Sequence, residues 1–109
     1  MDGAQPRQLT STECAAVLRG LAEPLRLQIL ALLREGPMPV HQITDRLSVR
    51  QYQASRHLGA LYDLGLLTRE RRARSVFYAL SAPAKGLTAD GKAPDVGLIE
   101  LGCCQVCIK

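Results

Sequence analysis

The segment from about residue 40 to residue 80 constrains the fold of this 109-residue chain more than any other feature. Apolar residues at helical spacing predict a short helix at 40–47 and a longer one at 50–64, with a tight turn at Ser48 and Val49 between them. Two strand-like runs, 66–70 and 75–80, come next and are joined by a basic turn. This order predicts two helices that meet at a turn, followed by a β-hairpin.

Two further helices are predicted upstream of this segment. Thr10 and Glu13 form a capping-box pattern that opens the first helix, and Pro24 suits the first turn of the second. The Gly-Pro pair at 36–37 ends the second helix. Residues 1–9 show no periodicity and are predicted to be a frayed arm.

The ends of the long helix can be predicted from its flanking residues. Ser48 or Arg50 takes the N-cap position, and Ser48 with Gln51 is the better capping pair. Gly65 comes directly after the last helical residue, which is where glycine most often ends a helix.

The whole chain is expected to be α+β and mainly helical. Residues 1–82 are predicted to form a winged helix-turn-helix of four helices and a two-stranded β-wing, which binds DNA and dimerises. Proline and glycine recur beyond residue 82, so residues 83–109 are predicted to be a linker and an irregular C-terminal tail. No apolar run is long enough to span a bilayer and no signal-peptide pattern precedes the first helix, which predicts a cytoplasmic protein with no membrane partner.

The positive charge of the chain is concentrated in one segment, as a surface that binds a polyanion requires. Residues 50–74 hold six arginines against two acidic residues and account for the whole net charge of +4. The first half of the long helix is expected to read base edges in the major groove of duplex DNA, and the basic turn to contact phosphates or a narrow minor groove. For His57, a hydrogen-bonded structural role is the alternative. The predicted DNA-binding residues are Arg50, Gln51, Gln53, Ser55, Arg56, His57, Arg69, Arg71, Arg72 and Arg74.

Three of the four cysteines, Cys103, Cys104 and Cys107, fall within five residues near the C-terminus. A cytosolic chain keeps its thiols reduced, so this spacing suggests a soft-metal or redox site. On a helical turn or in a tight loop the three sulfurs would converge on one ion. Three thiolates suit trivalent arsenic or antimony, because structural zinc normally takes four ligands.

Several alternatives for the cysteines stay open. The cluster would be chemically idle, a redox switch, or part of a zinc or cadmium site completed by His41 or Cys14. Cys14 lies on the apolar stripe of the first helix, which favours a buried core thiol. If the tail folded back onto that helix, Cys14 would become an extra ligand.

Four runs of residues, in this order and spacing, carry a resemblance to a known family. They are Leu21-Ala-Glu-Pro-Leu-Arg-Leu-Gln-Ile-Leu-Ala-Leu-Leu, Ser55-Arg-His-Leu, Leu64-Gly-Leu-Leu and Val76-Phe-Tyr-Ala-Leu. Over about residues 12–80 the chain resembles the ArsR/SmtB family of metal-responsive repressors. The resemblance implies a homodimer that represses its operon and releases DNA when a metal or metalloid binds. The two-fold symmetry of such a dimer predicts a double-stranded operator with an inverted repeat.

The chain departs from the family pattern at three places. Many members carry Cys-Val-Cys at the start of the third helix, where this chain has Pro39-Val40-His41, so that metal site is not expected here. The wing turn has Arg72-Ala73 in place of the usual glycine. The family's C-terminal dimerisation helix is hard to see in the sequence, which leaves the first helix, with the tail, as the dimer surface.

Two other classes of protein fit the sequence less well than a regulator does. A small thiol reductase needs a strand–helix fold that places a low-pKa cysteine at a helix N-terminus, and nothing in the sequence predicts that fold. A metallochaperone would leave the arginines of residues 50–74 unexplained. We therefore expect a protein that is not an enzyme but a repressor, released by trivalent arsenic or antimony at Cys103, Cys104 and Cys107. Release by cadmium, by zinc or by thiol oxidation is the alternative.

Overall fold

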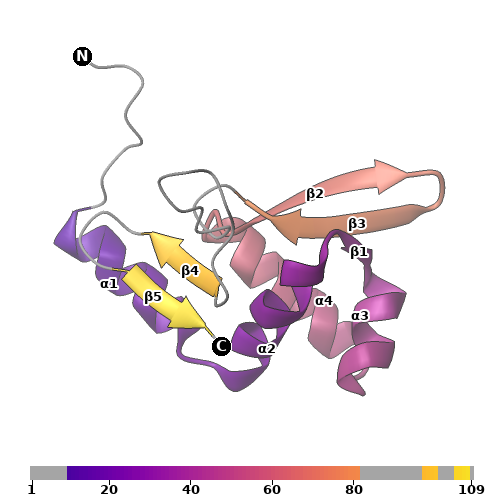
Figure 1. The fold of residues 1–109 in the computed structure, drawn as a ribbon, viewed down its shortest axis with the longest axis horizontal. Helices are drawn as coiled ribbons and strands as arrows, with labels where there is room; N and C mark the ends of the chain where they lie inside the picture. Colours follow the sequence, from indigo (N-terminus) through magenta and orange to yellow (C-terminus); the bar gives the residue numbers. More distant parts are fainter. Residues whose placement is uncertain (1–9, 82–96, 101–104, 109) are drawn as a thin grey trace, which may run out of the picture.

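The computed structural model describes residues 10–81, 97–100 and 105–108, and it has the winged helix-turn-helix architecture that the sequence predicts. Figure 1 shows the described helices packed together, with a long hairpin projecting from them. The helices are α1 (Ser11–Leu21), α2 (Pro24–Leu32) with a 3₁₀ turn η1 (Leu33–Glu35), α3 (Val40–Leu47) and α4 (Gln51–Asp63). The strands are β1 (Met38–Pro39), β2 (Leu67–Arg72), β3 (Ser75–Leu80), β4 (Gly97–Glu100) and β5 (Gln105–Ile108).

The first two helices begin where the sequence predicts, and for the predicted reasons. The Thr10 hydroxyl accepts a hydrogen bond from the Glu13 N–H at 3.1 Å, and a Glu13 carboxylate oxygen accepts one from the Thr10 N–H at 2.9 Å. This reciprocal capping box pairs two backbone donors that a helix leaves unsatisfied. Pro24 occupies the first position of α2, and the Glu23 carboxylate caps the Leu25 N–H at 3.2 Å.

The turn between α3 and α4 corrects the predicted N-cap of the long helix. Ser48 is the C-cap of α3 and lies in the left-handed region, with φ 55° and ψ 46°. An N-cap residue is extended instead, and Arg50 takes that position with φ −76° and ψ 149°. The chain needs the left-handed residue to turn out of α3, so Ser48 cannot also cap α4. Gly65 does come after α4 with a φ of 80°, as predicted.

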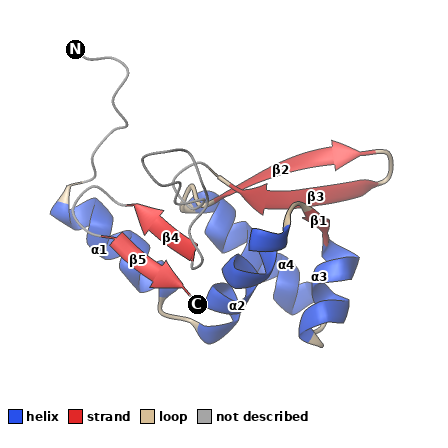
Figure 2. Ribbon diagram, viewed as in Figure 1, coloured by secondary structure: helices blue, strands red, loops and turns tan. Residues whose placement is uncertain are grey.

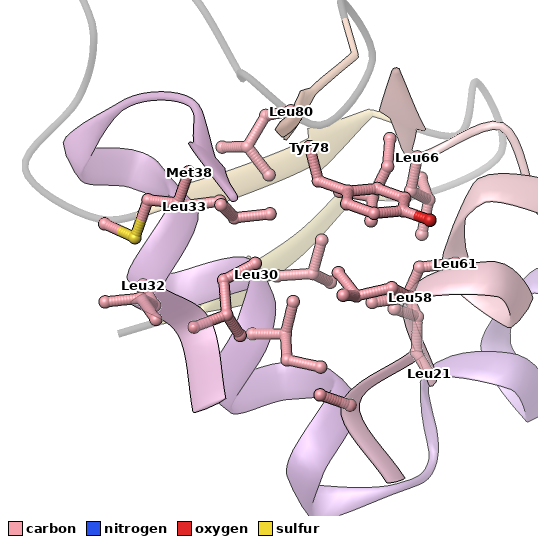
Figure 3. Close-up of a cluster of buried hydrophobic side chains, with 14 of the residues drawn as sticks. Leu21, Leu30, Leu32, Leu33, Met38, Leu58, Leu61, Leu66, Tyr78 and Leu80 are labelled. Carbon is pink, nitrogen blue, oxygen red and sulfur yellow. The ribbon is translucent and has the colours of Figure 1, made fainter. Parts of the chain in front are cut away.

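The core lies where the helices meet the base of the hairpin (Figure 3). Ile29 of α2 and Ile43 of α3 are fully buried, and Leu58 and Leu61 of α4 pack with them. The sheet contributes Tyr78 and further leucines. The inward face of α4 is thereby fixed, which also fixes the face that it turns outward.

The wing is tied to the rest of the domain by two features that the sequence analysis did not predict. Strand β1 pairs antiparallel with β3, so the sheet has the order β1-β3-β2. Pro39 is tolerated in β1 because this strand lies at the edge of the sheet. At the other end, the Ser81 hydroxyl donates to the Gly65 carbonyl at 2.7 Å and the Ser81 N–H donates to the Leu66 carbonyl at 2.9 Å.

The expectation of an irregular tail is wrong for the two tail segments that the structure describes. Strands β4 and β5 form a separate antiparallel sheet, with Leu98 opposite Cys107 and Glu100 opposite Gln105 (Figure 2). Apolar and β-branched residues dominate these eight positions, which favours strands over coil. Strand β5 lies against α2. The predicted division between residues 82 and 83 falls outside the described residues.

Candidate nucleic-acid interface

Helix α4 presents a polar stripe to solvent on the side opposite its buried residues. Ala54, His57, Leu58 and Leu61 point inward, and most of the predicted groove residues point away from them. Gln53 is only half-buried and lies at the border of the two faces. The exposed residues of the first half of the helix, with its N-cap, are Arg50, Gln51, Tyr52, Ser55 and Arg56.

Tyr52 belongs to this exposed stripe although it was not among the predicted DNA-binding residues. Its side chain is 68% exposed, and it lies four residues before Arg56, so the two are neighbours on the helix surface. The sequence did contain the signal, because a large aromatic residue at an outward position of a helix has no core to fill. Its apolar ring suits contact with a thymine methyl group.

His57 is placed differently from the prediction. Its side chain is 6% exposed, so it cannot reach a DNA groove from the outward face of α4. Instead its Nδ1 accepts a hydrogen bond from the Nε–H of Arg26 at 3.1 Å. The physical reason is helix periodicity, because a residue three positions after the buried Ala54 returns to the inner face. The structure therefore favours the alternative role, that of a hydrogen-bonded structural residue.

The arginines of the wing fall into two groups. Arg69 stacks on the ring of Tyr62, with its Cζ 4.0 Å from the ring centroid, and the Tyr78 hydroxyl holds the pKa of Arg69 above its ordinary value. Arg72 pairs with Glu70 at 2.7 Å and lies over the Phe77 ring at 4.8 Å.

Arg71 and Arg74 form the second group, and both are exposed. Neither has a partner among the residues that the structure describes. The turn between the strands contains Ala73 with a φ of 53°, at the position where the family usually has glycine. The wing therefore presents two guanidiniums without a partner among the described residues, while Arg72, the third arginine predicted for the turn, is paired with Glu70.

The cysteine predictions receive two corrections. Cys14 is buried on α1, as predicted, at 3% exposed, but it is disulfide-bonded rather than a reduced core thiol. The other cysteines of the chain are Cys103, Cys104 and Cys107. Cys107 falls in strand β5, which corrects the idea of a helical turn at that residue, while Cys103 and Cys104 lie outside the described residues. Within the part of the chain that is described, no three potential ligands gather into a metal site.

Comparison with known sequences finds a matched region that contains the whole of α4. Residues 21–70 match the model of a helix-turn-helix domain. The chain is 39% identical to the transcriptional regulator NmtR of Mycobacterium tuberculosis over 70 residues, which cover 64% of this chain and 58% of NmtR. It is 33% identical to the transcriptional activator HlyU of Vibrio cholerae over 78 residues, which cover 72% of each chain. The matched part thus spans less than two thirds of NmtR but more than two thirds of HlyU.

Solved structures agree with the sequence comparison. Reduced HlyU from Vibrio cholerae superposes with a TM-score of 0.62 at 35% identity, over 66% of this chain and 76% of that one. The homodimeric winged helix-turn-helix DNA-binding domain of Mb0332 from Mycobacterium bovis superposes with a TM-score of 0.62 at 29% identity, over 72% and 77% of the two chains.

Among the described helices, none has the length and apolar character needed to cross a bilayer.

Proposed function

Since this chain belongs to the ArsR/SmtB family of winged-helix transcriptional regulators, we propose that it represses transcription by binding duplex DNA through α4 and the β2–β3 wing. The observation that carries the proposal is the separation of two surfaces on α4. One side builds the core, while the other presents polar and basic side chains to solvent, and the wing adds Arg71 and Arg74, which are exposed and have no partner among the described residues. The family consists of regulators rather than enzymes, which agrees with the expectation from the sequence.

The proposed division of labour follows from the chemistry of the exposed side chains. An α-helix fits the major groove, where Gln51 would pair with adenine, Arg56 with guanine, and Tyr52 would contact a thymine methyl group. Arg71 and Arg74 would bind phosphates or a narrow minor groove from the wing. The proposal thus adds Tyr52 to the predicted contacts, removes His57, and assigns no separate contact to Arg69 and Arg72, which have partners within the wing and at Tyr62.

We propose that the chain acts as a homodimer on an inverted repeat. One α4 reads one half-site, so two copies related by a two-fold axis would read two half-sites about one helical turn apart. The relative from Mycobacterium bovis is described as homodimeric. On α1, Leu18 is 42% exposed although it lies on the apolar stripe, which supports α1 as part of the dimer surface.

Selection from a random DNA library tests this proposal, because no operator has to be assumed. Duplexes retained by the wild-type protein are sequenced, and the strongest is footprinted. We expect two protected half-sites related by an inverted repeat, and a dimer in sedimentation at micromolar concentration. Failure to enrich any sequence, or a single half-site bound by a monomer, would contradict it.

For the inducer, we propose that Cys103, Cys104 and Cys107 bind trivalent arsenic or antimony and thereby lower DNA affinity. In the reduced protein the donor set would fit, because three soft thiolates suit a three-coordinate thiophilic ion. A coupling of about 1–3 kcal/mol between the two sites would change DNA affinity about 5- to 150-fold.

A specific observation favours a second inducer, thiol oxidation. Cys14 is disulfide-bonded, so the structure contains a pair of cysteines in the oxidised state. Oxidation of two thiols by peroxide would form one disulfide and two water molecules. Reduction would return both thiols.

Serine variants separate the two inducers. A labelled protein–DNA complex is titrated in parallel with arsenite, antimonite, cadmium, zinc and peroxide. If a metalloid is the inducer, Cys14→Ser responds to arsenite as the wild type does, whereas serine at any of the three tail positions sharply weakens release. If oxidation is the inducer, Cys14→Ser abolishes the response to peroxide. A complex that none of these agents releases would refute both.

A further inference from the structure

One guanidinium links three helices on the inner side of the proposed recognition helix. Arg26 lies on α2, and its Nη1 donates a hydrogen bond to the Gly20 carbonyl of α1 at 2.8 Å. Its Nε–H donates to Nδ1 of His57 on α4 at 3.1 Å. The whole arrangement is partly buried, so water competes with these hydrogen bonds less than it would at the surface.

The hydrogen bond to His57 requires a neutral imidazole. An Nδ1 that accepts a hydrogen bond carries a lone pair, so the proton of the neutral ring must lie on Nε2. If Nδ1 gained a proton, the ring would lose its acceptor and two cations would face each other. Protonation therefore breaks this hydrogen bond between α2 and α4.

The charged groups around His57 act on its titration in opposite directions. Burial lowers the pKa of His57 below its ordinary value, and the Arg26 guanidinium on α2 lowers it further. Glu23, at the N-cap of α2, raises it, and Arg56 on α4 lowers it. The neutral ring is thus the stable form in the folded protein above the ordinary histidine pKa of about 6.5.

The contact is coupled to the outward face because both faces belong to one short helix. Arg56 precedes His57 directly and points to solvent, while His57 and Leu58 point inward. The direction of Arg56 is therefore set by how the inner face of α4 is held. Loss of the hydrogen bond at His57 would therefore act on the orientation of the outward side chains.

We propose that the Arg26–His57 hydrogen bond positions the recognition helix, and that its loss on acidification lowers DNA affinity. The inference rests on the proposed DNA binding. The direction in which DNA affinity changes with pH distinguishes this proposal from a simple charge effect. Added positive charge by itself would strengthen binding to phosphates as the pH falls. Here affinity is full while His57 of the free protein is neutral, and it falls as the pH drops through the lowered pKa of His57. We expect a loss of about 2- to 10-fold per subunit, the range that one ordinary hydrogen bond supplies.

The experiment measures affinity from pH 5 to pH 8 at constant ionic strength, with the duplex selected by the wild-type protein as the probe. His57→Asn keeps an acceptor oxygen near the position of Nδ1 but does not titrate, so its affinity should not fall on acidification. His41→Gln is the matched control, because His41 is exposed and is the only other histidine of the chain. It should keep the wild-type pH profile.

The wild-type protein alone also tests the inference, which covers the case in which a His57 variant does not fold. NMR titration of the imidazole nitrogens gives the pKa of His57 with and without DNA. Linkage requires that DNA lower this pKa further. An unchanged pKa, or a His57→Asn variant that keeps the wild-type pH profile, overturns the positioning role. If the wild type selects no duplex at all, the proposed DNA binding fails instead.

Discussion

Replacing Ser48 with glycine should stabilise the protein, which is an unusual expectation for a glycine substitution. Ser48 lies in the left-handed region at φ 55° and ψ 46°, between α3 and α4. It is exposed, and its side chain makes no hydrogen bond to the described residues. Ser48→Gly therefore removes a strained Cβ and sacrifices no contact that the structure describes.

The expected change in the free energy of unfolding is the difference between two opposing effects. A residue with a Cβ costs about 1–2 kcal/mol in the left-handed helical region. Glycine loses more backbone entropy on folding, by about 0.5–1 kcal/mol. The net gain is between zero and about 1.5 kcal/mol, and its central value of about 0.7 kcal/mol raises the melting temperature of a domain of this size by about 3–6 °C.

Thermal unfolding followed by circular dichroism measures this effect, and the chain offers a matched control. Ser55→Gly makes the same chemical change at an exposed residue inside α4, where φ is not positive. There glycine should destabilise the helix, by about 0.5 kcal/mol relative to serine. Opposite signs for the two variants support the reasoning. A Ser48→Gly protein that melts at or below the wild-type temperature would refute it.

Three further predictions concern the wing, the groove and the core. The double variant Arg71→Ala/Arg74→Ala should weaken binding to every duplex and flatten the dependence of affinity on salt, since these side chains are proposed to neutralise phosphates; competition with unrelated DNA over a salt series measures this. Arg56→Ala should cost about 1–3 kcal/mol on the selected duplex and relax its sequence preference, which repeating the library selection would show. Leu61→Ala should lower the free energy of unfolding by about 2–5 kcal/mol in urea titrations, because Leu61 is 0% exposed. A wing variant that changed sequence preference more than Arg56→Ala would reverse the assigned roles, and a loss below about 1 kcal/mol at Leu61 would contradict its central place in the core.

The elements with local causes could be predicted from the sequence. The capping box at Thr10, the proline at the start of α2 and the glycine after α4 each act over a few residues. Hydrophobic periodicity then places Leu58 and Leu61 in the core.

The features that depend on distant partners could not be predicted in the same way. Strand β1 spans two residues, and it exists only because β3 lies beside it. The inward position of His57 follows from periodicity, but its bond to Arg26 joins residues 31 apart in the chain. Whether a polar residue near the border of two helix faces points inward or outward depends on its contacts with distant residues. A single sequence does not show those contacts. The inducer, the dimer and the cytoplasmic location stay predictions.

The two hydrogen bonds of Ser81 anchor the end of the wing. Two hydrogen bonds join Ser81 to Gly65 and Leu66, so the hairpin begins and ends at one point, immediately after the last turn of α4. The residue that follows β3 is therefore bonded directly to the segment that follows α4, so the position of Ser81 and the C-terminal end of the recognition helix are fixed together.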